Sequence, residues 1–382
     1  MNLIAQMKFP SEKCAADLAD RGTSAADNAL WRVVAVLGAV ILAAGCATAP
    51  MTSRTTAATD AMERGGVFRS LTLDPGVEER ILALDPERVS DDDVRSALAK
   101  GPTPRIILLH GGIYPVHLIM KSFGVFLQRM GYPAEKLRDP VDGAYSQSPY
   151  GSSDRLTGEI AWYYEHDGVR AMMIGHSQGG VQAIKVLYEL EGDFGSEIAV
   201  WNPMADAPEG RFTITDPITG NTRPVVGISV AYVSAVGAGG AALLLPNQWN
   251  MARRSRTIPD TVDEFTGYII PGDLIAWTLA GATGANRYQH DGAVKVRNVT
   301  LPFSYNHITV PLTSSLASDD RAREWINSYR PAGGEEEVLN VPPDVKGENI
   351  VWAADVWFSV KKHWCLEAQQ LLRARRAALA AR

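Results

Sequence analysis

A tight glycine-rich turn between an apolar strand and a helix constrains the fold of this chain more than any other feature. The apolar run 171–174 is followed by G-H-S-Q-G-G at 175–180, and then by apolar residues at helical spacing, Val181, Ile184, Leu187 and Leu190. A strand can turn directly into a helix only where small residues let the two backbones approach. Ser177, at the centre of the turn, is then held in strained geometry with its hydroxyl exposed above the edge of a sheet.

The chain around this turn alternates apolar strands with helical patterns. Further strands are expected at 105–109, 198–201, 265–270 and 294–301, and helices at 117–130 and 153–166. Strands that are apolar on both faces and alternate with helices form a parallel sheet covered by helices on both sides. The sequence therefore predicts an α/β protein with a mostly parallel central sheet, and it contains no repeat of the solenoid type.

Composition excludes several classes of function. The 382 residues carry 37 basic and 43 acidic side chains, a formal net charge of −6, whereas a nucleic-acid-binding protein normally presents a basic face. Three cysteines cannot form a disulfide framework, and no C-x-x-C pair or histidine-rich run indicates a metal site. We expect no metal, no cofactor and no nucleic-acid partner.

A second strand end brings polar backbone groups to the same edge. The strand 105–109 ends in His110-Gly111-Gly112. The tetrahedral intermediate of acyl transfer needs two convergent hydrogen-bond donors. The first N–H groups of a helix are unpaired and carry the positive end of its dipole, so the helix after Ser177 can supply one donor. The glycine loop beside the turn can supply the other.

These motifs resemble the α/β-hydrolase family, in particular bacterial lipases and esterases with a G-H-S-Q-G-G turn. The resemblance covers about residues 104–311 and implies the α/β-hydrolase fold with Ser177 as the nucleophile. Carried over position by position, Gly175, His176 and Gly179 belong to the nucleophile elbow around that serine.

The same resemblance implies an oxyanion hole formed by two backbone N–H groups, those of Gln178 and Gly112. His110 and Gly111 belong to the oxyanion loop, in which His110 is expected to brace the backbone rather than to take part in the chemistry.

The general base must be a histidine that follows the serine and the acid in the chain. His290, His307 and His363 qualify by position. His363 lies in an expected C-terminal helix, where a solvated surface position is expected, and His290 precedes the last strand, at the wrong end of the sheet. His307 follows the strand 294–301 and is the expected base that takes the proton of Ser177.

The acid of the triad has three candidates. Asp273 follows the strand 265–270 at the expected catalytic edge and is the preferred one. Asp206 follows the preceding strand, where some lipases place their acid. Asp291 lies in D-G-A-V, which resembles another lipase acid motif, but it precedes His307 by only sixteen positions. Each of the three could instead be a turn or helix-capping aspartate.

The N-terminus resembles the signal peptide of bacterial lipoproteins. Arg32 is followed by thirteen uncharged, mostly apolar residues, which as a helix span about 20 Å against the ~30 Å hydrocarbon core of a bilayer. The segment ends in L-A-A-G-C at 42–46. The resemblance implies removal of residues 1–45 and attachment of a diacylglyceryl group to Cys46. An uncleaved signal anchor and an ordinary secretory peptide are the alternatives.

This resemblance also predicts a location. Residues 46–65 are expected to form a flexible tether. The protein is then anchored in the bacterial cell envelope through its lipid, at the outer membrane and facing the periplasm.

The remaining chain is expected to form a hydrolase domain at 66–350 with an insertion at 203–262. Residues 225–246 within the insertion carry no charge. The preferred interpretation is a cap or lid over Ser177, and additional core and a transmembrane span are the alternatives. A helical pattern rich in tryptophan and arginine predicts a C-terminal tail at 351–382, which either docks on the domain or contacts anionic lipid headgroups.

The sequence thus predicts a serine hydrolase that cleaves a small-molecule or lipid ester through an acyl-enzyme. Acyl transfer and amidase action on the same triad are alternatives. A catalytically silent lipoprotein that uses the scaffold for binding is another. The sequence does not predict the oligomeric state.

Overall fold

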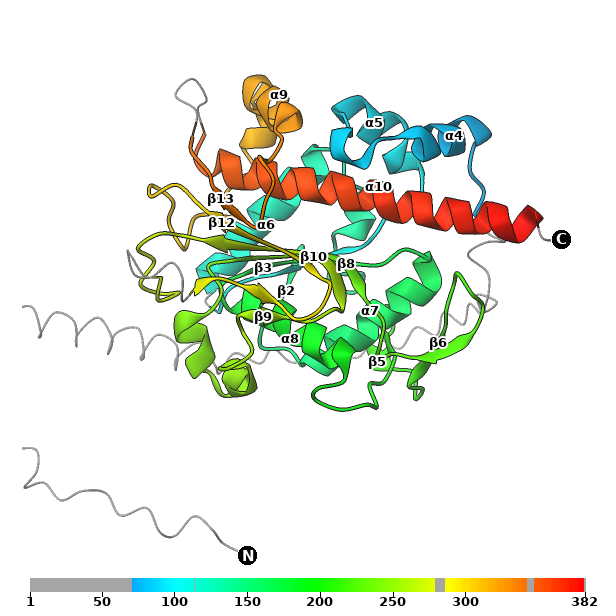
Figure 1. Cartoon of the computed structure of the whole chain (residues 1–382), viewed down its shortest axis with the longest axis horizontal. Coiled ribbons are helices and arrows are strands. Elements are labelled where there is room, and N and C mark those ends of the chain that lie inside the picture. Colours follow the sequence, from blue (N-terminus) through cyan, green and yellow to red (C-terminus); the bar gives the residue numbers. More distant parts are fainter. Residues whose placement is uncertain (1–70, 113, 279–285, 342–346, 381–382) are drawn as a thin grey trace, which may run out of the picture. The chain divides into compact units, whose positions relative to one another are not determined.

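Seven parallel strands form the central sheet of the computed structural model, which describes residues 71–112, 114–278, 286–341 and 347–380. The order across the sheet is β13-β12-β10-β8-β3-β1-β2, and every neighbouring pair is parallel (Figure 1). The strands are β1 (Ile106–Leu109), β2 (Ser146–Gln147), β3 (Met172–His176), β8 (Val230–Val236), β10 (Val262–Ile269), β12 (Lys295–Thr300) and β13 (Glu336–Val338).

Helices cover both faces of this sheet. They are α4 (Pro75–Ala83), α5 (Asp91–Ser96), α6 (Tyr114–Arg129), α7 (Ser153–Asp167), α8 (Gln178–Glu191), α9 (Asp320–Ser328) and α10 (Ile350–Ala380). Short 3₁₀ helices connect them: η2 (Pro86–Arg88), η3 (Leu98–Lys100), η4 (Ala134–Lys136), η5 (Gly240–Leu244), η6 (Pro246–Met251) and η8 (Leu316–Ser318). The α/β class predicted from the sequence is confirmed.

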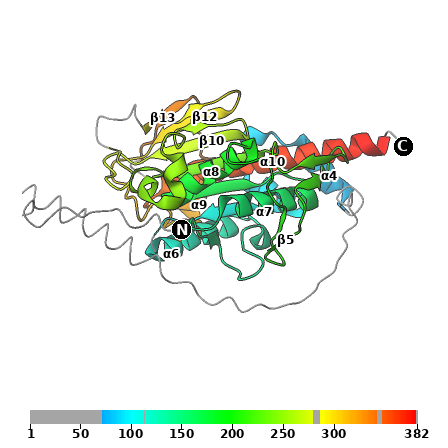
Figure 2. The same cartoon turned by 90° about the horizontal axis from the view of Figure 1, so that it is seen from below.

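The two faces have separate hydrophobic cores because successive residues of a strand point to opposite sides. Ile106 and Leu108 of β1 pack in the core that includes α6 and α10. Ile107 and Leu109 pack in the core formed with α7 and α8. Figure 2, in which the molecule is seen from below, shows α7 and α8 over this second face.

The order of the strands reverses between β1 and β3. From β1 the chain passes to β2 on one side, and then to β3 on the other side before continuing outward to β8. Ligands of open α/β sheets bind outside the carboxyl ends of the strands at such a reversal. The loop that begins at His110 and the turn at Ser177 follow β1 and β3, so both lie at this point.

The predicted cap at 203–262 is wrong in its central part. Residues Val230–Val236 form β8, which pairs with β3 and β10, and all seven residues are buried. The segment lacks charge because it forms a core strand that is covered on both faces. Hydrophobic periodicity alone does not distinguish such a strand from another kind of buried apolar segment. The strand predicted at 198–201 is also wrong, since only Trp201–Asn202 is extended, and it pairs outside the central sheet with Ala207–Pro208.

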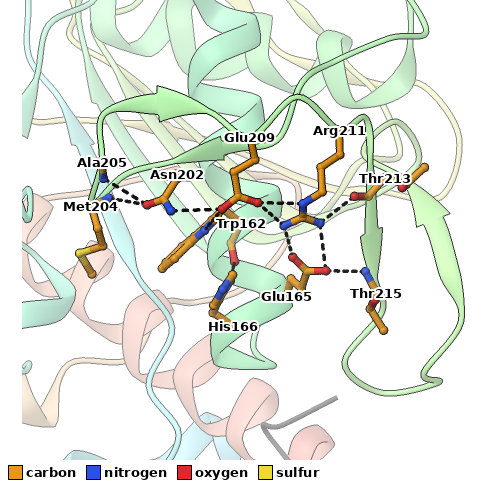
Figure 3. Close-up of polar contacts among 10 residues, drawn as sticks. All are labelled: Trp162, Glu165, His166, Asn202, Met204, Ala205, Glu209, Arg211, Thr213 and Thr215. Carbon is orange, nitrogen blue, oxygen red and sulfur yellow. Dashed lines mark hydrogen bonds and ion pairs between the residues drawn. The ribbon is translucent and has the colours of Figure 1, made fainter. Parts of the chain in front are cut away.

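The first part of the predicted cap packs along α7. Two hairpins lie here. In the first, β4 (Trp201–Asn202), just before the predicted cap, pairs with β5 (Ala207–Pro208), and in the second β6 (Thr213–Thr215) pairs with β7 (Thr222–Pro224). Arg211 lies between them and pairs with Glu165 of α7 at 2.5 Å and with Glu209 at 2.7 Å (Figure 3). One part of the predicted cap lies at the carboxyl edge of the sheet. It is the loop that follows β8 and contains η5 and η6.

The predicted C-terminal tail is a structural layer of the domain. The helix α10 crosses one face of the sheet, and its Trp352, Trp357 and Trp364 are fully buried. Near its end, Arg376 pairs with Glu78 and Glu79 of α4, each at 2.5 Å. This arginine is therefore held by carboxylates of the same domain, as expected for a docked helix.

The predicted signal peptide at 1–45, Cys46 and the tether at 46–65 lie outside the described residues. No helix in the described ranges is both long and apolar enough to cross a membrane. A short parallel pair, β9 (Thr257–Ile258) with β11 (Gln289–His290), completes the secondary structure used below.

Candidate active site

Ser177 lies on a strained turn between β3 and α8. Its backbone has φ +54° and ψ −121°, a region that residues with a side chain rarely adopt. The turn closes because the flanking positions are glycine. A Cβ at Gly175 would lie 2.5 Å from the Gly179 carbonyl oxygen, and one at Gly179 would lie 2.3 Å from the Leu109 carbonyl oxygen. The two glycines of G-x-S-x-G are therefore required by backbone contacts here.

His307 lies within hydrogen-bond distance of this serine. Its Nε2 is 2.9 Å from Ser177 Oγ, and its side chain is buried. It reaches the site from the loop after β12, and the left-handed Gly237 at the end of β8 makes room for the ring, since a Cβ there would be 2.9 Å from His307 Nδ1. The geometry is that of a base in contact with the hydroxyl it deprotonates.

Asp273 completes the set on the far side of the imidazole. His307 Nδ1 donates to Asp273 Oδ2 at 2.5 Å. The other carboxylate oxygen accepts the backbone N–H groups of Ile275 at 2.9 Å and Ala276 at 3.0 Å. The loop after β10 thus fixes the carboxylate, which in turn fixes the tautomer and the orientation of the ring.

The structure does not bring the alternative acids to the histidine. Asp206 pairs with Arg155 at 2.8 Å and accepts a hydrogen bond from Trp201. Asp291 is exposed, and its backbone N–H donates to Ile258 in the edge pair of β11 and β9.

The two other histidines also lie apart from Ser177. His290 is exposed in β11. The expected surface position of His363 is wrong: the side chain is buried, stacks on Tyr232 with ring centroids 5.2 Å apart, and lies 3.4 Å from the Glu264 carboxylate. The helix α10 is buried around this position, which its sequence alone does not reveal.

The glycine loop after β1 packs directly on the elbow. A Cβ at Gly111 would lie 3.2 Å from Ser177 Cβ, and one at Gly112 would lie 2.3 Å from the Gln178 side-chain oxygen. The N–H of Gln178 is the first of α8 and has no intrahelical partner. His110 Nδ1 lies 2.7 Å from the Gly111 carbonyl oxygen, so this ring contacts the backbone of its own loop.

His176 has a contact that the motif does not reveal. Its Nε2–H donates to the backbone carbonyl of His307 at 2.6 Å. The side chain is fully buried, and burial lowers the pKa of His176 to about 3. The imidazole is therefore neutral at physiological pH and ties the elbow to the loop that carries the base.

No group of three or more His, Cys, Asp or Glu side chains in the described parts of the chain is arranged to hold a metal ion. The groups that meet at the carboxyl edge are a hydroxyl, an imidazole, a carboxylate and backbone N–H groups. This set can transfer a proton and stabilise an oxyanion.

Comparison with known proteins adds a partial similarity. No family model matches the chain. A proline iminopeptidase from Flavobacterium johnsoniae is 30% identical to it over 115 residues, 28% of this chain and 38% of that protein. The chain thus covers less than two thirds of that relative. Together with the parallel sheet and the elbow after β3, this similarity agrees with an α/β-hydrolase fold.

Proposed function

We propose that this protein is a serine hydrolase that cleaves carboxylic esters through an acyl-enzyme. One observation carries the proposal: Ser177 Oγ, the His307 ring and the Asp273 carboxylate form a continuous hydrogen-bonded chain, with distances of 2.9 Å and 2.5 Å. The same constellation of hydroxyl, imidazole and carboxylate performs acyl transfer on several unrelated folds.

The reaction follows from this geometry in two halves. Ser177 Oγ attacks the ester carbonyl carbon while its proton passes to His307 Nε2, and the N–H groups of Gln178 and Gly112 stabilise the negative carbonyl oxygen. The intermediate collapses, the alcohol leaves with the proton from His307, and the acyl group stays on the serine. Water then attacks this ester with His307 as base, and the carboxylic acid leaves as Ser177 regains its proton.

Apolar side chains around the site support an apolar substrate. Large exposed side chains occur on three loops that follow strands of the sheet at its carboxyl edge. They are Leu244 and Trp249 after β8, Leu274 and Trp277 after β10, and Phe303 after β12. Asp273 belongs to the second of these loops, so an acyl chain or an apolar alcohol can lie against apolar surface beside the triad.

Amide hydrolysis is the second candidate because the partial relative is named a proline iminopeptidase. The same triad can cleave an amide, since His307 can protonate an amine as well as an alcohol. We expect faster turnover of a p-nitrophenyl ester than of proline p-nitroanilide. Faster turnover of the anilide, measured as kcat/KM, would favour the second candidate.

Covalent labelling tests the proposal directly. A fluorophosphonate probe is expected to label the purified protein at a single residue, Ser177, as read by mass spectrometry of the digested protein. The activated hydroxyl displaces fluoride, and the oxyanion donors stabilise the phosphonyl oxygen. The matched control is Ser177→Ala, which should take up no probe. Absence of labelling in a protein that unfolds cooperatively, together with no turnover of any ester, would support the silent scaffold.

We also propose that the protein is a lipid-anchored envelope protein, on the strength of the L-A-A-G-C sequence that ends at Cys46. The full chain expressed in a bacterium should fractionate with membranes, and Cys46→Ser should move it to the soluble fraction or leave its precursor uncleaved. The lipid anchor would be contradicted if the wild-type protein and Cys46→Ser associated equally with membranes and the mass of the wild-type chain showed no attached lipid.

A further inference from the structure

Tyr150 contacts the glycine loop that follows β1. Its hydroxyl donates to the Gly112 carbonyl oxygen at 2.7 Å. The residue comes from the loop after β2, the strand on the other side of β1 from Ser177, and nothing in the elbow motif points to it. Burial raises the pKa of Tyr150, so its hydroxyl remains a proton donor across the pH range in which an ester hydrolase works.

The loop that carries Tyr150 is itself fixed at its neighbouring residues. The Gly151 carbonyl accepts a hydrogen bond from Gln182 of α8 at 3.1 Å. The Pro149 carbonyl accepts one from Asn247 of η6 at 3.2 Å. The loop around Tyr150 is therefore hydrogen-bonded to α8 and to η6. The first N–H of α8 is that of Gln178.

The glycine loop needs such an external support. Gly111 and Gly112 have no side chains with which to anchor themselves, and two successive glycines have wide backbone freedom. Gly112 lies between two side chains of other elements, because a Cβ on it would be 2.3 Å from the Gln178 oxygen and 3.0 Å from the Tyr150 hydroxyl. Oxyanion stabilisation depends on donors that already point at the developing charge before the reaction begins.

We propose that Tyr150 is a positioning residue. Its hydrogen bond holds the Gly112 carbonyl, which belongs to the peptide after Gly112, and so restricts the backbone of the residue whose N–H is expected in the oxyanion hole. This inference rests on the proposed hydrolase function. Water can satisfy the same carbonyl at this partly exposed position, but it is not attached to the scaffold and cannot hold the Gly112 backbone in place. The effect of Tyr150 is therefore on the alignment of the donor.

Tyr150→Phe removes the hydroxyl and keeps the ring. We expect kcat to fall about 10- to 100-fold, less than or similar to the loss of a whole oxyanion donor, with KM for the ester unchanged within about twofold. The inhibition constant of a trifluoromethyl ketone, which adds Ser177 to give an oxyanion, should rise by the same factor as kcat falls. The inhibition constant of the matching methyl ketone, which remains trigonal, should not change.

Tyr132→Phe is the matched control. The Tyr132 hydroxyl also donates to a backbone carbonyl, that of Pro104 at 2.5 Å, but this bond lies before the start of β1. Its loss should lower the unfolding midpoint and leave the ratio of the two ketone inhibition constants unchanged. Asn247→Ala, which loosens the Tyr150 loop from the other side, should change that ratio in the same direction as Tyr150→Phe, by a smaller factor.

The outcomes separate this inference from the proposed function. Wild-type protein that hydrolyses esters and binds the trifluoromethyl ketone tightly, together with a Tyr150→Phe variant of equal kcat and equal ketone ratio, would overturn the role of Tyr150 alone. An equal loss of affinity for both ketones would also overturn it, because it would show a general change of the pocket. A wild-type protein that neither hydrolyses esters nor reacts with the fluorophosphonate would overturn the proposed function instead.

Discussion

Replacing His307 by alanine is expected to lower kcat for an aryl ester by about 10⁶-fold, the scale found when the base or the nucleophile of such a triad is removed. Nε2 of this ring is 2.9 Å from Ser177 Oγ, and without it the serine hydroxyl keeps its proton. Ser177→Ala should cost as much. The double variant should be no less active than either single one, because the two residues act as a unit.

Initial rates with p-nitrophenyl butyrate, measured on protein freed of other esterases, check this result. His290→Ala is the control, since that histidine is exposed in β11, and its kcat should stay within about twofold of the wild type. A His307→Ala variant that keeps more than 1% of the wild-type rate would show that another group removes the proton.

Asp273→Asn is expected to lower kcat by about 10⁴-fold with little change in KM. The amide has nearly the shape of the carboxylate and can still accept the N–H groups of Ile275 and Ala276 through its oxygen. Its NH₂ group then faces Nδ1 of His307, which favours the tautomer with the proton on Nε2, and a protonated Nε2 cannot accept the proton of Ser177. The positive charge that forms on the imidazole also loses its counter-ion.

The two aspartates that also fitted the sequence pattern are the controls for this variant. Asp206→Asn and Asp291→Asn should each retain kcat within about threefold, since Asp206 pairs with Arg155 and Asp291 is exposed. Asparagine also tolerates the left-handed backbone of Asp206, where φ is +49°. If Asp206→Asn or Asp291→Asn lost activity while Asp273→Asn kept it, the acid would be misassigned. Rates at a pH near neutrality are sufficient.

Much of the site could be predicted because it depends on backbone contacts that only glycine permits. The contacts of Gly175 and Gly179 leave no room for a Cβ, so the elbow is visible in the sequence. His307 and Asp273 could be chosen because each follows a recognisable strand, and the carboxyl ends of parallel strands share one edge.

The contacts of Tyr150 and His176 could not be predicted, because no local sequence pattern encodes them. Tyr150 follows the two-residue strand β2 (Ser146–Gln147), which is too short to give a periodic signal. The contact of His176 is with a backbone carbonyl 131 residues away. Such a partner is chosen by the three-dimensional fold, and neither residue type nor spacing encodes it.

The central part of the cap was predicted in error because a segment without charge can have either of two structural roles. An apolar cover and a central strand both avoid charged residues. In the structure Gly237 directly follows β8, has φ +59° and lies against His307. β8 is therefore the strand that places Gly237 beside His307.

The burial of α10 has a consequence for the timing of folding. β1 ends at residue 109 and packs in the same core as a helix that begins at residue 350, a separation of about 240 residues. At a synthesis rate of about 5–20 residues per second, this face of the sheet waits about 10 to 50 seconds for its cover. Until then the apolar side chains on this face remain available to chaperones.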